Sequence, residues 1–182
     1  MKKRLLCFNV NGIRARLSQL EAVVEVHEPE IIGLQETKVH DDEFPVDEIH
    51  SLGYGVDYFG QKGHYGVALL SKIPPIKIVK GFPTDGTEAQ RRIIHGCYRY
   101  NNQDLHVING YFPQGENRAH PIKFPAKKKF YDDLYRYMVS NFTAEDRIVV
   151  MGDMNVAMQD EDVGITPENA KRWLSTGKTS FL

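Results

Sequence analysis

The sequence predicts a sheet-based domain of the α/β or α+β class, and three patterns along the chain carry this prediction. The N-terminal part alternates strand, helix and strand, which is typical of a crossover unit with parallel strands. The middle holds a series of short apolar segments separated by Gly, Pro and Asn-Asn, which is typical of antiparallel hairpins. Late in the chain, a continuous apolar run follows a helical segment and predicts a central strand.

The first elements follow from the spacing of apolar residues. Residues 5–10 form an apolar run rich in β formers, which predicts a strand that Gly12 ends. Between residues 17 and 27, apolar side chains recur at helical spacing opposite charged ones. This pattern predicts an amphipathic helix that ends near Pro29. Residues 31–34 predict a second buried strand, parallel to the first.

The later elements are shorter and closer together. We expect strands at residues 54–59, 65–71, 76–81, 92–100 and 105–111. Apolar residues at helical spacing then predict a helix over residues 126–140, and residues 148–151 supply the central strand. Thr166 and Pro167 are suited to the N-cap and first position of a short helix that ends near residue 174. A chain of 182 residues without internal repeats predicts one domain over residues 1–182.

Composition limits the classes of function. The chain is 41% hydrophobic and 26% charged with a net charge of −1, so any nucleic acid must bind through a local basic patch. Cys7 and Cys97 lie far apart in apolar runs, which predicts two reduced core thiols in a reducing compartment. The apolar run after the basic start is too short for a signal peptide, and no segment reaches membrane-spanning length. We therefore expect a cytoplasmic protein without a membrane partner.

Polar residues of one chemical kind follow several of the predicted strands. Asn9 follows the first strand, Glu36 the second, and Asp153 and Asn155 the late apolar run. Each residue alone is typical of a turn or a solvated carboxylate. Together, if their strands are neighbours, they bring two carboxylates and two amide oxygens to one edge of the sheet. Such hard oxygen ligands suit Mg²⁺ or Mn²⁺, whereas a zinc site would need His and Cys.

Several short motifs, spread in order from the first strand to the end of the chain, carry a family resemblance. They are Phe-Asn-Val-Asn-Gly-Ile-Arg at residues 8–14, Gly-Leu-Gln-Glu-Thr-Lys at 33–38, Gly-Asp-Met-Asn at 152–155, and the segments 60–68, 90–94, 109–115 and 171–174. In these motifs the chain resembles the bacterial exonuclease III family. So many matches in one order are far more specific than a single short pattern.

The resemblance implies a deoxyribonuclease I-like sandwich of two sheets flanked by helices. It also implies a magnesium-dependent enzyme, with manganese as an alternative cation. The expected activities are incision of DNA 5′ to abasic sites, 3′→5′ exonuclease action on duplex DNA, and 3′-phosphatase activity. The expected partners are double-stranded DNA with abasic sites or blocked 3′ ends, bound by a monomer that is associated with the nucleoid while it acts.

The resemblance also implies roles for single residues. Glu36 would be the main metal ligand, and Asn9, Asp153 and Asn155 would complete the metal site. Asp153 would orient or deprotonate the attacking water, or protonate the leaving group. Asn155 would stabilise the transition state, and Tyr111 would contact the scissile phosphate. The expected DNA contacts are Lys62, His64, Tyr65, Arg92 and Gln114.

Other charged and aromatic residues have simpler interpretations. Arg91 and Arg92 together suit a phosphate clamp, because a matching motif covers both. The run of lysines at residues 127–129 opens a helix and predicts a solvated face. Tyr131, Tyr135 and Tyr137 lie at helical spacings and predict packing more than a platform for stacking bases.

The exonuclease III family also differs from this sequence, because family chains continue into a later segment with a closing Ser-Asp-His motif. No Ser-Asp-His occurs here. The resemblance therefore implies an endonuclease/exonuclease/phosphatase-type domain without its C-terminal part. It also implies little activity for these residues alone, because loss of a catalytic acid or base typically lowers the rate roughly 10²–10⁴-fold. Two alternatives stay open at this point: another phosphoesterase of the superfamily, such as a phosphatase or sphingomyelinase, or a shortened, non-catalytic DNA-binding module.

Overall fold

A computed structural model of the chain describes residues 3–157 and residue 168. The chain divides into two compact units. The first unit comprises Met1–Tyr111 with Asn141–Asp153, and the second comprises Phe112–Ser140 with Met154–Leu182. Each unit is described by itself below. That residues 1–182 form one domain stays a prediction.

The first unit contains two four-stranded sheets. The first sheet has the order β1-β2-β4-β3, with β1 at Leu5–Asn9, β2 at Ile31–Gln35, β4 at Val67–Ser71 and β3 at Gly55–Phe59. The second has the order β5-β6-β7-β8, with β5 at Lys77–Lys80, β6 at Ile93–Tyr100, β7 at Gln103–Tyr111 and β8 at Arg147–Asp153. The pairs β1–β2 and β7–β8 are parallel, and the other neighbours are antiparallel. The predicted crossover of strand, helix and parallel strand is confirmed.

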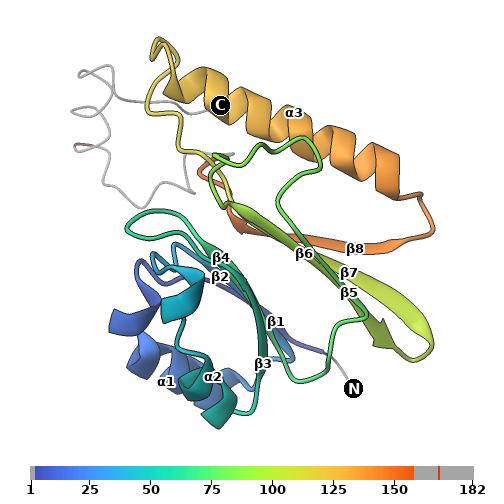
Figure 1. The fold of residues 1–182 in the computed structure, drawn as a ribbon. Helices are drawn as coiled ribbons and strands as arrows, with labels where there is room; N and C mark the ends of the chain where they lie inside the picture. Colours follow the sequence, from blue (N-terminus) through green and yellow to red (C-terminus); the bar gives the residue numbers. More distant parts are fainter. Residues whose placement is uncertain (1–2, 158–167, 169–182) are drawn as a thin grey trace. The chain divides into compact units, whose positions relative to one another are not determined.

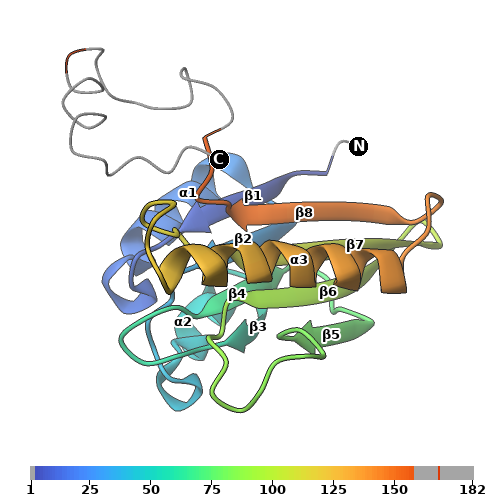
Figure 2. The ribbon, with the colours of Figure 1, turned by 90° about the horizontal axis from the view of Figure 1, so that it is seen from above.

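The first sheet separates two apolar layers. Helices α1 (Leu17–His27) and α2 (Val46–Ser51) lie on one of its faces, and the second sheet lies on the other (Figures 1 and 2). Because neighbouring strand residues point to opposite faces, Ile32 and Leu34 pack in the layer under the helices, while Ile31 packs between the sheets. This arrangement confirms the expected two-sheet sandwich with flanking helices.

A pair of buried amide side chains ties the two sheets together. Gln35 Nε2 donates to Asn109 Oδ1 at 2.6 Å, and Asn109 Nδ2 donates to the carbonyls of Leu34 and Ala68, each at 2.9 Å. Both side chains are fully buried. Buried polar groups that are fully paired specify one arrangement of their surroundings. The pair therefore fixes the end of β2 against β7, next to the residue that follows β2.

The second unit is built around helix α3, at Lys123–Asn141. Phe112 packs edge-on against Phe130, with ring centroids 5.0 Å apart, and against Tyr131 at 5.1 Å. Tyr137 is buried, which confirms its predicted packing role. Tyr135 is 70% exposed, so the packing prediction is wrong for that residue, which lies on the solvated side of the helix.

Some elements differ from the sequence-based prediction. Helix α3 begins three residues before the predicted start, with Pro125 in its first turn, where a missing N–H costs nothing. Three short helices were not predicted because one or two turns show no clear periodicity: α2, and the 3₁₀ helices η1 (Ile13–Ala15) and η2 (Asp41–Glu43). The helix predicted at residues 167–174 lies outside the described residues, apart from Glu168.

Two further predictions need correction. Strand β8 was expected in the centre of a sheet, but within the described part of the chain it pairs only with β7, and of its residues only Met151 is buried. Cys97 is a buried free thiol as expected, whereas Cys7 is free but exposed, because its strand β1 is the end strand of its sheet. Among the described residues, no helix is long and apolar enough to cross a membrane.

Candidate active site at the strand ends

Four of the predicted site residues lie at the ends of strands in the first unit. Asn9 ends β1, Tyr111 ends β7 and Asp153 ends β8, while Glu36 follows β2 directly. The parallel register brings Asn9 opposite the residue before Glu36 and places Tyr111 opposite Asp153. Glu36 has a left-handed backbone with φ of 54°, an uncommon conformation that turns the chain at the end of its strand. Asn9, Glu36 and Asp153 thus lie together as the strand-end pattern indicated, but they come from two sheets and not from one edge of a single sheet.

Asn9, Glu36 and Asp153 form what we call the carboxylate cluster. Asn9 Nδ2 donates to Glu36 Oε1 at 2.7 Å and to Asp153 Oδ2 at 2.9 Å, so one amide group bridges both carboxylates. Asn9 Oδ1 accepts the backbone N–H of Asn11 at 3.0 Å, which sets the orientation of the amide. In this arrangement Asn9 holds two negative charges side by side.

Glu36 is surrounded by hydrogen-bond donors. Lys38 Nζ lies 2.8 Å from Glu36 Oε2 and also contacts Asn11 Oδ1. Partial burial alone would raise the pKa of Glu36, but hydrogen bonds from Lys38, Asn9 and Tyr111 outweigh it and lower the pKa below its usual value. Glu36 is therefore held as a carboxylate. Sequence reasoning gave Lys38 no role, although it lies in the same motif as Glu36.

Tyr111 and Arg92 extend the cluster on one side. Burial, together with the nearby Glu36 carboxylate, raises the pKa of Tyr111 to about 12, so its hydroxyl keeps its proton at neutral pH. The Arg92 guanidinium lies 4.1 Å from the ring centroid of Tyr65 and 4.7 Å from that of Tyr111, and Arg92 Nη1 donates to Tyr111 O at 3.0 Å. The rings of Tyr65 and Tyr111 thus hold the positively charged guanidinium of Arg92 in place near Glu36.

The donor set of the cluster fits a hard cation. Two carboxylates face one amide group, and the described residues contain no group of three or more His, Cys, Asp or Glu side chains that could hold a metal ion. A cation at Glu36 and Asp153 would therefore complete its coordination with amide, water or phosphate oxygens, which is usual for Mg²⁺ and Mn²⁺. As oriented here, Asn9 presents nitrogen to the carboxylates, so it would support such a cation through them.

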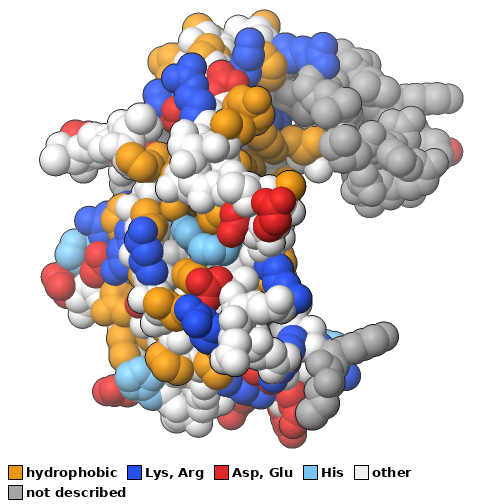
Figure 3. Space-filling model, turned by 90° about the vertical axis from the view of Figure 1, so that its right-hand side faces the viewer, with side chains coloured by type: hydrophobic (Ala, Val, Ile, Leu, Met, Phe, Trp, Pro, Cys, Tyr) orange, Lys and Arg blue, Asp and Glu red, His pale blue; other side chains and the backbone are white. Residues whose placement is uncertain are grey.

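The predicted DNA contacts in the first unit lie on the loop of residues 60–66 and on Arg92. Lys62 has a side chain that is 78% exposed and lies 4.0 Å from Glu43, and His64 is exposed beside Tyr65. Tyr65 is half-buried, with its ring 6.4 Å from that of Tyr111. On the face shown in Figure 3, Lys and Arg side chains are spread among acidic and apolar ones, as the net charge led us to expect.

Asn155 and Gln114 belong to the second unit, where a buried lysine binds the main chain of both. Lys127 Nζ donates to Asn155 O at 2.9 Å and to Gln114 O at 3.4 Å, and Tyr131 donates to Met154 O at 2.9 Å. We call Gln114, Met154 and Asn155 with these two donors the lysine-anchored loops. Lys127 is 6% exposed, so the prediction of a solvated lysine face is wrong for this residue. The local sequence pattern could not predict its partners, because the carbonyls of Gln114 and Asn155 lie 13 and 28 residues away.

The surroundings of Lys127 and Asn155 affect both side chains. Desolvation lowers the pKa of Lys127, whose ammonium group has carbonyl partners but no carboxylate in this unit among the described contacts. Asn155 Nδ2 donates to Phe112 O at 2.9 Å. Gly115 has φ of +81°, and a Cβ there would lie 2.7 Å from Lys127 Cδ, so the chain needs glycine to let the lysine pass.

Comparison with known proteins finds one matching family and several similar enzymes. The sequence profile of the family described as "Endonuclease/Exonuclease/phosphatase family" matches residues 6–181. Exodeoxyribonuclease III of Haemophilus influenzae is 55% identical over 179 residues, which cover 98% of this chain and 67% of that protein. DNA repair nuclease APEX1 of Danio rerio is 26% identical over 193 residues, covering 98% of this chain and 60% of that protein.

Solved structures give the same picture for the fold. An AP endonuclease from Archaeoglobus fulgidus superposes with a TM-score of 0.81 at 33% identity, covering 93% of this chain and 63% of that one. The 3′ phosphatase NExo from Neisseria, bound to a product DNA hairpin, superposes with a TM-score of 0.82 at 28% identity, covering 94% of this chain and 63% of that one. The chain thus spans about two thirds of the length of these relatives.

Proposed function

The chain belongs to the endonuclease/exonuclease/phosphatase family, and within it to the exonuclease III group, and from this premise we propose that the protein is a DNA-repair nuclease. The reaction is cation-dependent hydrolysis of phosphodiester bonds, by incision 5′ to abasic sites and by 3′→5′ exonuclease action on duplex DNA. The same site also removes 3′-phosphate groups by hydrolysis of a phosphomonoester. Mg²⁺ is the proposed cation, with Mn²⁺ able to replace it. The proposal includes a monomeric enzyme of the cytoplasm that acts on double-stranded DNA with abasic sites or blocked 3′ ends.

The observation that carries this proposal is the carboxylate cluster. A pair of carboxylates that share one amide donor, at 2.7 Å and 2.9 Å, repel each other unless a cation or further donors compensate. A structural role would be served as well by neutral side chains. Two adjacent carboxylates beside an arginine and a tyrosine hydroxyl instead suit a phosphate substrate that arrives with a divalent cation.

Each side chain has a defined part in the proposed reaction. A bound cation supplies charge neutralisation for the phosphate and alignment of the attacking water. Glu36 is the principal cation ligand, and Asn9 keeps Glu36 and Asp153 in place. The carboxylate of Asp153 accepts a proton from the attacking water or, in the alternative assignment, returns one to the leaving oxygen.

The neutral donors act on the phosphate itself. Tyr111 keeps its proton at neutral pH, since its pKa is raised to about 12, so its hydroxyl can donate to a non-bridging phosphate oxygen. The side-chain amide of Asn155 is proposed to stabilise the transition state in the same way, without adding charge. Neither group changes protonation state during this step.

The DNA backbone is held by residues around the reaction centre. Arg92 supplies a guanidinium next to Tyr111, and the loop of residues 60–66 supplies Lys62, His64 and Tyr65. Gln114 is the proposed contact from the second unit. Since the net charge is only −1, these local contacts must provide most of the attraction to phosphate, and binding should weaken as salt rises.

A substrate panel tests this proposal. Intact protein with Mg²⁺ is given an abasic-site duplex, a duplex with a 3′-phosphate, an undamaged duplex, inositol phosphates and sphingomyelin. We expect cleavage of all three DNA substrates, loss of cleavage with excess chelator, and no turnover of the last two. Turnover of sphingomyelin or inositol phosphates in place of DNA would assign the protein to another branch of the family, and salt-dependent binding of duplex without any cleavage would indicate a DNA-binding module.

A further inference from the structure

The loop of residues 60–66 is fixed at its C-terminal end by main-chain hydrogen bonds. Gly66 N donates to Arg91 O at 2.9 Å, and Thr37 N donates to Gly66 O at 3.1 Å. Lys38 N donates to Tyr65 O at 3.0 Å. This end of the loop is therefore hydrogen-bonded to the residues that follow Glu36. It places the ring of Tyr65 next to Arg92.

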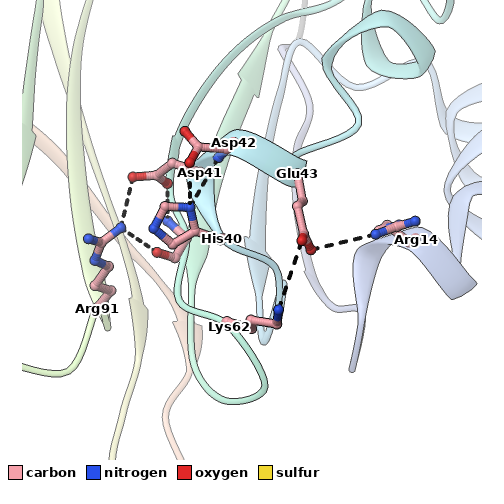
Figure 4. A network of polar contacts seen from close by, with 8 residues as sticks. Arg14, His40, Asp41, Asp42, Glu43, Lys62 and Arg91 are labelled. Atoms are coloured by element: carbon pink, nitrogen blue, oxygen red, sulfur yellow. Dashed lines mark hydrogen bonds and ion pairs between the residues drawn. The ribbon is translucent and has the colours of Figure 1, made fainter.

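The other end of the loop is held by side chains from two distant parts of the chain. Asp41 Oδ1 accepts the N–H of Gly60 at 2.6 Å, and Asp41 Oδ2 accepts Arg91 Nη1 at 2.8 Å. Arg91 Nη1 also donates to Gly60 O. Figure 4 shows the contact between the side chains of Arg91 and Asp41. Both polar groups of one loop residue are thus taken by a single Arg–Asp pair, which we call the loop clamp.

At Gly60, the first residue of the loop, the main chain passes close to the loop clamp. A Cβ added to Gly60 would lie 2.5 Å from Val39 O and 3.0 Å from Asp41 Oδ1. Real Cβ atoms do not approach carbonyl oxygens so closely, so only glycine lets the main chain pass this near to the clamp. The position of Gly60 is therefore set directly by Asp41 and by the chain around it.

The described contacts of the Arg91 side chain are all with groups of the protein. Its guanidinium pairs with Asp41, its carbon lies 4.9 Å from the ring centroid of Phe59, and its main-chain N–H donates to Gln61 Oε1 at 3.0 Å. The side chain is 30% exposed. The two arginines that were predicted to clamp a phosphate together therefore have different surroundings. Arg92 lies next to the carboxylate cluster, whereas Arg91 is bound to Asp41 and Gly60.

We propose that Asp41 and Arg91 are positioning residues for DNA binding: together they hold the 60–66 loop so that Lys62 and Tyr65 meet the DNA backbone beside Arg92. This inference rests on the proposed function. Loss of the loop clamp should weaken the grip on DNA and leave the chemical step nearly unchanged, because neither residue touches the carboxylate cluster. The mechanism predicts a rise in KM rather than a fall in kcat.

Two variants and a matched control pair test the clamp. Asp41→Asn keeps the shape of the side chain but removes its charge. Arg91→Lys keeps the charge but replaces the planar guanidinium, whose Nη1 reaches both acceptors, by an ammonium group on a side chain of different shape. The control pair Arg99→Met and Asp104→Asn breaks another Arg–Asp contact, 2.6 Å long and exposed, at the far end of β6 and β7. Urea unfolding of all four variants verifies that each is folded.

Two readouts decide the outcome. Trypsin cleavage after exposed Lys62 should become about tenfold faster in both clamp variants, the scale of one charge-assisted hydrogen bond. KM for an abasic duplex should rise about tenfold, with kcat changed less than about twofold, while the control variants change neither value. The double variant Asp41→Asn with Arg91→Lys should resemble the single variants, because both break the same contact.

Results that overturn the inference are distinct from those that overturn the proposed function. Unchanged trypsin cleavage after Lys62, unchanged KM, or a fall in kcat without a rise in KM would each refute the positioning role. Intact wild-type protein, as used in the substrate panel, that shows no cation-dependent cleavage of any DNA substrate would refute the proposed function instead.

Discussion

The two regions that carry the predicted site residues are held in opposite ways. In the carboxylate cluster, side chains at strand ends bind one another, and Asn9 bridges Glu36 and Asp153. In the lysine-anchored loops, Lys127 and Tyr131 bind main-chain carbonyls instead. The first region owes its geometry to strand ends of two packed sheets, and the second owes it to donors from one helix. Substitutions in the first region should therefore remove groups that take part in the reaction. Substitutions in the second should disturb the position of the loops.

The largest expected effect is in the carboxylate cluster. Asp153→Asn removes the proposed proton acceptor but keeps an oxygen for Asn9 Nδ2, so kcat should fall roughly 10²–10⁴-fold while stability changes by less than about 1 kcal/mol. Steady-state incision of an abasic duplex and urea unfolding measure the two quantities. Asp104→Asn, a change at an exposed carboxylate, should leave both unchanged. Full activity in Asp153→Asn would show that this carboxylate has no chemical role.

Sequence reasoning reached the first region because strands leave a strong pattern. Apolar runs predicted the positions of β1, β2 and β8. The polar residues that follow these runs, Asn9, Glu36 and Asp153, were predicted as site residues. The parallel pairing of β1 with β2 follows from the crossover between these strands, whereas Asp153 approaches from the second sheet through the packing of the two sheets. Local patterns therefore predicted a sheet-based domain and named the three residues of the cluster, while the two-sheet sandwich was expected from the family resemblance.

The second region could not be found in this way. A lysine in a run of three at the start of a helix has the pattern of a solvated face, and only the fold brings Asn155 O and Gln114 O to Lys127. The buried pair of Gln35 and Asn109 was missed for the same reason, since its hydrogen bonds join residues 74 positions apart. Contacts of this kind depend on tertiary structure, which local periodicity does not encode.

The next largest effect tests whether the sheets hold the first region in place. Asn109→Ala would remove the side-chain donor from the carbonyls of Leu34 and Ala68 and would leave Gln35 Nε2 with the Gly33 carbonyl as its remaining described partner, at a cost of about 1–3 kcal/mol for each buried group left unpaired. The urea midpoint measures this loss. Gln103→Ala, at an exposed position of the same strand, should change the midpoint little. A small effect of Asn109→Ala would mean that apolar packing alone fixes the end of β2.

The comparable test in the second region is Lys127→Met. The variant keeps most of the side-chain volume but frees the carbonyls of Gln114 and Asn155, so the rate should fall roughly 10–100-fold through loss of position. Lys128→Met, at an exposed neighbour, is the matched control and should change the rate less than about twofold. If Lys127→Met and Lys128→Met behave alike, the buried lysine does not position the loops.

The smallest effect is a dependence of stability on pH in the first unit. His95 Nε2 lies 3.0 Å from His106 Nδ1, and burial, together with His106 and Lys77, lowers the pKa of His95 from 6.5 to about 4. The unfolded chain therefore binds more protons between these values, so stability falls as pH decreases from about 6.5 to 4, by at most about 3 kcal/mol.

His95→Gln should flatten this part of the pH profile of the urea midpoint, and His27→Gln, at the exposed end of α1, should not. Hydrogen exchange at pH 5 should show peptides of β6 and β7 opening more readily than at pH 7.5, with α3 unchanged. Equal acid sensitivity in wild type and His95→Gln would contradict the assignment of this effect to His95.

The most direct test of the central claim, that the carboxylate cluster is a cation site for phosphodiester hydrolysis, is Mn²⁺ binding followed by electron paramagnetic resonance. The account predicts binding to the wild-type protein that is weakened at least about tenfold in Glu36→Gln, while Glu43→Gln, at an exposed carboxylate, binds as the wild type does. Equal Mn²⁺ affinity in wild type and Glu36→Gln would contradict the account, whatever the enzymatic activity of the variant.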